Sequence, residues 1–183
     1  DLGPWERQEI EGFYYDSSIL FDDDGRVYIV HGNRNIWITE LNEDLTAPKE
    51  GGLRRNIVND LPDINLGYEG SHIYKIRGKY YLFNIHWPKM RTESCFMADS
   101  LEGEFVGRDV LEDDMGYHNQ GVAQGGIVDT PDGDWYAILF QDHGAVGRIP
   151  ILLPVTWEDD WPVFGVNGRV PDLFEVHSTR PDY

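Results

Sequence analysis

A spacing pattern that occurs three times along the chain constrains its fold more than any other feature. In each copy a residue with a carboxyl or amide side chain precedes a glycine by nine positions, and a tyrosine follows that glycine by three. The three copies are Asp16, Gly25 and Tyr28; Glu69, Gly78 and Tyr81; and Gln124, Gly133 and Tyr136. Because these glycines are 53 and 55 positions apart, one supersecondary unit is used three times.

Each copy predicts a β-hairpin. The turns contain the Asp and Gly residues that tight reversals favour, as in Asp23-Asp24-Gly25 and Asp132-Gly133. The expected strand pairs are residues 19–21 with 27–30, 72–75 with 80–83, and 127–128 with 135–139. A repeat of about 50 residues made of antiparallel strands is typical of a β-propeller blade. The chain is therefore expected to be all-β, and three blades are too few to close a ring.

The repeat predicts one partial propeller domain over residues 1–183, with units at about 14–66, 68–112 and 117–164. Further out in each unit, additional strands are expected at 35–41, 94–98, 149–153 and 155–157.

The composition narrows the range of partners. The chain has 183 residues and a formal net charge of −18, so nucleic acid and anionic membrane surfaces would be repelled. The single Cys95 cannot form an internal disulfide, and no apolar run is long enough to cross a membrane. A neutral ligand remains compatible with the charge, and no signal assigns a cellular compartment.

The polar residues at the ends of the hairpins predict a shared site. In a blade the second strand returns to the rim where the first began, so residues that open strand one and close strand two meet there. The openers are Asp16, Glu69 and Gln124, and the residues eight positions beyond each turn glycine are Asn33, His86 and Gln141. Six polar side chains around one axis are what a ligand site requires.

Two carboxyl groups at equivalent positions of neighbouring blades suggest a particular chemistry. Asp16 and Glu69 would face the same cavity, and a pair of acids in a walled cavity is the equipment for glycoside hydrolysis. Burial and the like charge would keep one of them protonated as the general acid. The alternative is that both only cap strand ends or bind water at the rim.

A family resemblance adds to this reading. Its motifs are YDSSILFDDDG at 15–25, EGSHIYK at 69–75, VDTPDG at 128–133 and LPVTWEDDWPVFG at 153–165. Together and in this order the motifs resemble glycoside hydrolase family 43, which includes β-xylosidases, α-L-arabinofuranosidases and arabinanases. The resemblance extends over nearly the whole chain. It implies a five-bladed β-propeller, of which this chain supplies about three blades.

The resemblance also implies roles for individual residues. Glu69 matches the general acid of the family, and Asp16 matches the residue that tunes the pKa of that acid, although Ser17 replaces the usual Pro. Arg148 resembles the arginine that hydrogen-bonds the sugar beside the acid. Trp87 is placed to stack on a sugar ring, with loop packing as the alternative.

Two departures from the family pattern qualify the expectation. No motif matches the aspartate that serves as general base, so the base is expected from a missing N-terminal segment or a second polypeptide, and this chain alone is expected to be inactive. Gln124 stands where many members have a histidine that helps to hold a central cation or water. No cofactor is expected to be required, and the replacement weakens the case for a structural calcium ion at the propeller centre.

The sequence therefore predicts an inverting glycosidase that acts on xylose- or arabinose-containing oligosaccharides or polysaccharides of plants. The competing hypothesis is a non-catalytic propeller that only binds carbohydrate or serves as a scaffold. The sequence does not distinguish xylosidase, arabinofuranosidase and endo-acting enzymes.

Overall fold

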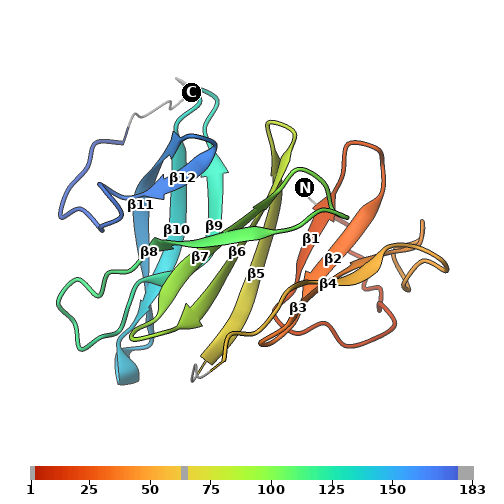
Figure 1. The fold of residues 1–183 in the computed structure, drawn as a ribbon, viewed down its shortest axis with the longest axis horizontal. Helices are drawn as coiled ribbons and strands as arrows, with labels where there is room; N and C mark the ends of the chain where they lie inside the picture. Colours follow the sequence, from red (N-terminus) through yellow and green to blue (C-terminus); the bar gives the residue numbers. More distant parts are fainter. Residues whose placement is uncertain (1–2, 63–65, 177–183) are drawn as a thin grey trace.

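The computed structural model describes residues 3–62 and 66–176, and these form three four-stranded antiparallel sheets. Figure 1 shows the sheets side by side, with the second sheet between the first and the third. The first strands of neighbouring sheets contact each other, β1 with β5 and β5 with β9. This is the arrangement of three consecutive propeller blades, and the all-β, partial-propeller prediction is confirmed.

Each sheet is built from consecutive strands in sequence order. The first contains β1 (Ser18–Phe21), β2 (Val27–His31), β3 (Ile36–Glu40) and β4 (Arg54–Val58). The second contains β5 (Leu66–Ile76), β6 (Lys79–Trp87), β7 (Thr92–Ala98) and β8 (Val106–Leu111). The third contains β9 (Ala123–Asp129), β10 (Trp135–Asp142), β11 (Arg148–Glu158) and β12 (Trp161–Phe164), with a short 3₁₀ helix, Gly144–Val146, before β11.

The apolar core is divided into two layers, one on each side of the second sheet. Strand β6 supplies both layers because successive side chains of a strand point to opposite faces. Leu82 packs with Tyr28 and Val30 in the layer between the first and second sheets. Phe83 packs with Leu139 in the layer between the second and third sheets. The middle blade is therefore covered on both faces, which fixes the direction of its side chains.

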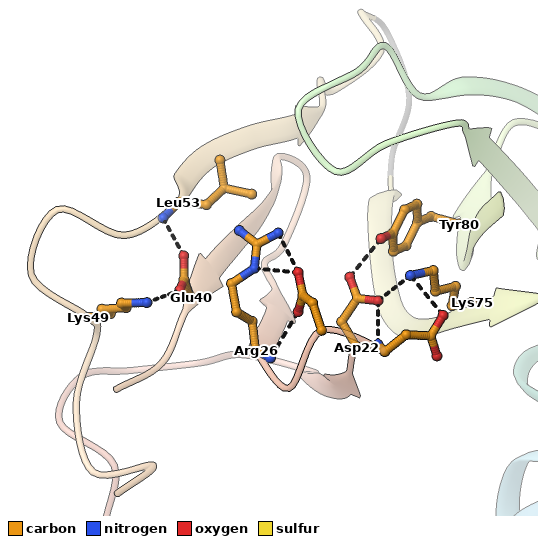
Figure 2. Close-up of polar contacts among 9 residues, drawn as sticks. Asp22, Arg26, Glu40, Lys49, Leu53, Lys75 and Tyr80 are labelled. Atoms are coloured by element: carbon orange, nitrogen blue, oxygen red, sulfur yellow. Dashed lines mark hydrogen bonds and ion pairs between the residues drawn. The ribbon is translucent and has the colours of Figure 1, made fainter. Parts of the chain in front are cut away.

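A buried polar cluster joins the first two blades at the rim where β1 ends and β5 ends (Figure 2). The Asp22 carboxylate accepts hydrogen bonds from the Lys75 ammonium and, at 2.6 Å, from the Tyr80 hydroxyl. Burial by itself would raise the pKa of Asp22, but these hydrogen bonds outweigh it and hold the pKa below its usual value. The ionised pair therefore fastens the blades together at the rim opposite Asp16 and Glu69.

The predicted hairpins are confirmed, but the outer part of the third unit differs from the prediction. Residues 149–153 and 155–157 belong to one strand, β11, and the fourth strand is β12. Pro154 does not interrupt β11 because its carbonyl faces β12 and accepts a hydrogen bond from the Gly165 amide at 2.8 Å. Its nitrogen points to the same side, beyond the end of β12, so the missing N–H breaks no ladder bond.

No helix within the described part of the chain is long and apolar enough to cross a membrane.

Candidate active site

The backbone brings the predicted acids together at one rim. Asp16 lies just before β1, and Glu69 lies in the irregular first part of β5, where the pairing with β6 shifts register on both sides of it. The Ser71 amide donates a hydrogen bond of 3.2 Å to the Asp16 carbonyl, which fixes the two blades to each other at this point. The juxtaposition expected from the repeat is therefore present.

The Glu69 carboxyl is half-buried and has partners from the first blade. Asn33 Nδ2 donates to Glu69 Oε2 at 2.7 Å, and the Tyr15 hydroxyl also hydrogen-bonds this carboxyl. Burial raises the pKa of Glu69, and the negative charge of Asp16 raises it further. Because Oε2 accepts from Asn33, a proton on the neutral acid is favoured on Oε1.

Two arginines act on Glu69 in the opposite direction. The positive charges of Arg91 and Arg148 lower the pKa of Glu69, although burial and Asp16 prevail and the net direction is upward. Both guanidinium groups lie near the Phe140 ring, with Cζ at 4.8 Å from its centroid for Arg91 and 4.4 Å for Arg148. Arg148 is exposed, whereas Arg91 is buried. The acid therefore stands between one negative and two positive charges.

The third opener, Gln124, packs directly behind the acid. Its backbone has φ +62°, and its amide N–H donates to Glu93 Oε2 at 2.6 Å. Glu93 is fully buried, and burial raises the pKa of its carboxyl well above the ordinary value. The Gln124 side chain lies against Gly70, the residue after Glu69, where a Cβ would be only 2.8 Å from Gln124 Cγ. Close approach at this position therefore requires glycine.

Trp87 lies at the end of β6 and lines a cavity between the second and third blades. Its indole nitrogen donates to the Lys89 carbonyl at 3.2 Å, and its ring faces the Arg91 guanidinium, with 6.0 Å from Cζ to the ring centroid. The position of Trp87 in the cavity wall is compatible with stacking on a sugar ring, and its contacts with Lys89 and Arg91 are compatible with loop packing.

The structure places His86 and Gln141 in the interior, not at the open rim where the sequence predicts them. His86 is buried, its Nε2 lies 2.7 Å from Asp109 Oδ1, and its ring stacks on Tyr68. Gln141 is also buried, and its amide nitrogen donates to two loop carbonyls. Asn33 lies beyond the end of β2, but His86 and Gln141 are still inside β6 and β10, so their side chains point between blades.

The structural calcium ion at the propeller centre stays a prediction. Among residues 3–62 and 66–176, no three His, Cys, Asp or Glu side chains come together as metal ligands.

Three residues of the site were not predicted from the sequence. Tyr15 could have been predicted as a site residue, because it directly precedes Asp16 in the first motif. Arg91 directly precedes β7 and Glu93 lies near its start, so an arginine and a glutamate around a buried strand could have indicated an internal polar site.

Comparison with known proteins decides the family. The sequence profile of "Glycosyl hydrolases family 43" matches residues 1–162. The chain belongs to this family. The matched residues include Asp16, Glu69 and Arg148, so the candidate site lies within the shared region of the family 43 fold.

Individual relatives agree with the family assignment. A xylosidase/arabinosidase of Butyrivibrio fibrisolvens is 30% identical, over 99% of this chain and 40% of its own length. Xylosidase/arabinosidase 43B of Humicola insolens is 30% identical, over 98% of this chain and 38% of its own length. A solved structure described as bifunctional GH43-CE of Bacteroides eggerthii is 47% identical with a TM-score of 0.84, over 95% of this chain and 22% of that chain. This family 43 chain thus spans less than half the length of these relatives.

Proposed function

We propose that the protein is an inverting glycosidase that acts on xylose- or arabinose-containing oligosaccharides or polysaccharides. Glu69 protonates the leaving glycosidic oxygen while a general base activates water on the opposite face of the sugar. The base comes from another part of the propeller, either a further segment of the same protein or a second polypeptide. No cofactor takes part.

The observation that carries this proposal is the environment of Glu69. A general acid must be protonated near the working pH, and burial together with the charge of Asp16 pushes the pKa of Glu69 in that direction. Asp16 is thus the modulator of the acid. Asn33 and Tyr15 hold the carboxyl in place through hydrogen bonds.

The remaining rim residues are proposed to contact the sugar. The exposed Arg148 lies close enough to Glu69 to influence its pKa and has donors free to orient hydroxyl groups. Trp87 offers an aromatic face at the rim, and the Gln124 amide lies beside Gly70. His86 and Gln141 are left out of this set because they are buried.

Two exposed apolar surfaces support the presence of further blades. On β1, Ile19 is 43% and Phe21 is 69% exposed on the face that points away from the second sheet. On the third sheet, Val128 is 54% and Ile138 is 55% exposed. Apolar surface of this kind is normally covered, and a neighbouring blade on each side would cover it. The greater length of the relatives agrees with this proposal.

The proposal is tested by assaying the full-length protein on aryl β-xyloside and aryl α-L-arabinofuranoside while proton NMR follows the anomeric signals. We expect hydrolysis of at least one substrate, with the first-formed sugar in the anomeric configuration opposite to that of the substrate. A product that retains its configuration would contradict the inverting mechanism. Binding of xylo-oligosaccharides without hydrolysis of any substrate would favour the binding-only propeller.

Replacement of Gly70 by alanine tests whether the position of Glu69 matters for the reaction. Gly70 has φ +67°, and the new Cβ would force the Gln124 side chain to move. Gly78→Ala is the matched control, because its φ is +80° but nothing lies within 4 Å of the added Cβ. We expect both variants to lose about 1 kcal/mol of unfolding free energy from the backbone conformation. Only Gly70→Ala should lose activity, by about tenfold in kcat/KM. Equal activity losses in both variants would contradict the positioning role.

A further inference from the structure

A cavity of about 470 Å³ lies at the rim between the second and third blades. Its walls include Trp87 from β6, Arg91 just before β7, Tyr117 and His118 from the connecting loop, and Asp142 from the end of β10. We call it the inter-blade pocket. Arg91 relates this pocket to the reaction centre, because its charge lowers the pKa of Glu69.

Arg91 is under-satisfied for a buried cation. The residue is only 8% exposed, and its Nε and Nη1 have no hydrogen-bond partner among the described residues. Its remaining nitrogen, Nη2, lies 3.6 Å from Asp142 Oδ2, which is longer than a charge-assisted hydrogen bond. A guanidinium removed from water is normally paired and hydrogen-bonded, so this position is suited to receive a further acceptor.

The charges around the inter-blade pocket favour an anion. Burial lowers the pKa of Arg91, the charge of Asp142 raises it, and the charge of nearby Arg148 lowers it. Glu69 contributes no charge when it is protonated to act as the acid. Asp16 also lies near Glu69, so two positive and two negative side chains surround this part of the rim, whereas the chain as a whole has a net charge of −18. This local enrichment in positive charge is more than a site for neutral sugars requires.

The wall that contains Tyr117 is held in place by contacts with the third blade. Tyr117 stacks on His143, with 4.0 Å between ring centroids, and His143 Nε2 lies 2.8 Å from Gln141 Oε1. The Gln141 amide nitrogen donates to the Asp114 and Gln120 carbonyls, both at 2.7 Å, and so fixes the two ends of the loop that carries Tyr117. Aromatic side chains on two sides suit a sugar ring, and the guanidinium suits a carboxylate on that ring.

We infer that the inter-blade pocket binds a uronic acid residue of the substrate, with its carboxylate on Arg91. The inference rests on the proposed function and narrows it: the preferred substrates are xylo-oligosaccharides that carry a uronic acid close to the bond that is cleaved. Binding moves the Arg91 guanidinium from its long contact with Asp142 to the ligand carboxylate. Trp87 and Tyr117 contact the faces of the sugar.

The test compares two ligands that differ only in the carboxylate. One is xylotriose with a single glucuronic acid branch, and the other is the same compound after its carboxylate has been reduced to a hydroxymethyl group. Calorimetric titrations use the full-length protein with Glu69→Gln, which prevents turnover. We expect the acidic ligand to bind about tenfold more tightly, because a charge-assisted pair replaces a neutral contact. Equal affinity for the two ligands would overturn the inference.

Variants of the pocket sharpen the comparison. Arg91→Met should reduce the affinity for the acidic ligand to that for the reduced one, whereas Arg91→Lys should keep part of the preference. Asp142→Asn should increase the affinity for the acidic ligand several-fold, because it removes the competing carboxylate. Arg7→Met is the matched control: it also removes one positive charge, but from an exposed side chain on the N-terminal segment.

The outcomes separate this inference from the proposed function. A preference for the acidic ligand that persists in Arg91→Met would overturn the assignment to Arg91, and so would an Asp142→Asn variant with weaker binding. If the reduced ligand binds equally well and neutral aryl glycosides are hydrolysed, the uronic acid inference fails while the glycosidase stands. If neither ligand binds and no aryl glycoside is cleaved, both proposals fail.

Discussion

Replacing Glu69 by glutamine is expected to lower kcat/KM for an aryl β-xyloside by about 10³-fold, within the range that a general acid contributes. Glutamine keeps the size of the side chain and can still interact with Asn33, but it has no proton to give to the leaving oxygen. Steady-state kinetics of the full-length protein, with circular dichroism to verify folding, measures the effect.

The dependence on the leaving group identifies the lost step. The dinitrophenolate leaving group of a dinitrophenyl glycoside departs without protonation. The rate of hydrolysis of this substrate should therefore fall much less in Glu69→Gln than the rate for xylobiose, whose sugar leaving group must be protonated. Glu102→Gln makes the same chemical change on an exposed turn before β8 and should leave the rate unchanged. Full activity of Glu69→Gln on xylobiose would remove Glu69 from the role of acid.

The fold follows from the sequence because the repeat encodes it locally. A turn with glycine and flanking apolar residues predicts a hairpin wherever it occurs, and three copies at nearly equal spacing predict three blades. The same argument places Asp16 next to Glu69, because both residues open the first strand of a blade. The pairing across two blades thus required no knowledge of distant contacts.

The same counting failed where strand length differs between blades. β2 ends at His31, so Asn33 is free to turn towards Glu69, but β6 continues to Trp87 and keeps His86 within the sheet. Strand ends are set by the packing of neighbouring blades, and local sequence records them poorly.

Arg91 and Glu93 were missed for a related reason. Arg91 directly precedes β7 and Glu93 lies within it, where an apolar side chain would also fit a buried strand, and their partners belong to the third blade. Contacts between residues that are 31 or more positions apart leave no local pattern. The inter-blade pocket could therefore be recognised only once the blades were placed beside each other.

Replacing Asp16 by asparagine is expected to move the alkaline limb of the pH profile of kcat/KM to lower pH. Glu69 acts only while protonated, so activity is lost as the pH rises through the pKa of its carboxyl in the free enzyme. The negative charge of Asp16 raises that pKa, and asparagine removes the charge. Activity should therefore be lost at a lower pH than in the unmodified protein, and the rate at the optimum should fall as well if Asp16 also orients the sugar.

Two comparisons make the sign of this shift decisive. Asp132→Asn removes the same charge from an exposed hairpin turn at the opposite rim and should leave the profile in place. Arg148→Met removes a positive charge that lowers the pKa of Glu69, so its alkaline limb should move to higher pH. Opposite shifts of the alkaline limb in Asp16→Asn and Arg148→Met require one titrating acid that both side chains influence. A change in folding or substrate affinity alone would shift the alkaline limb in the same direction in both variants, or in neither. An unshifted or alkaline-shifted profile in Asp16→Asn would show that Glu69 is not under the control of Asp16.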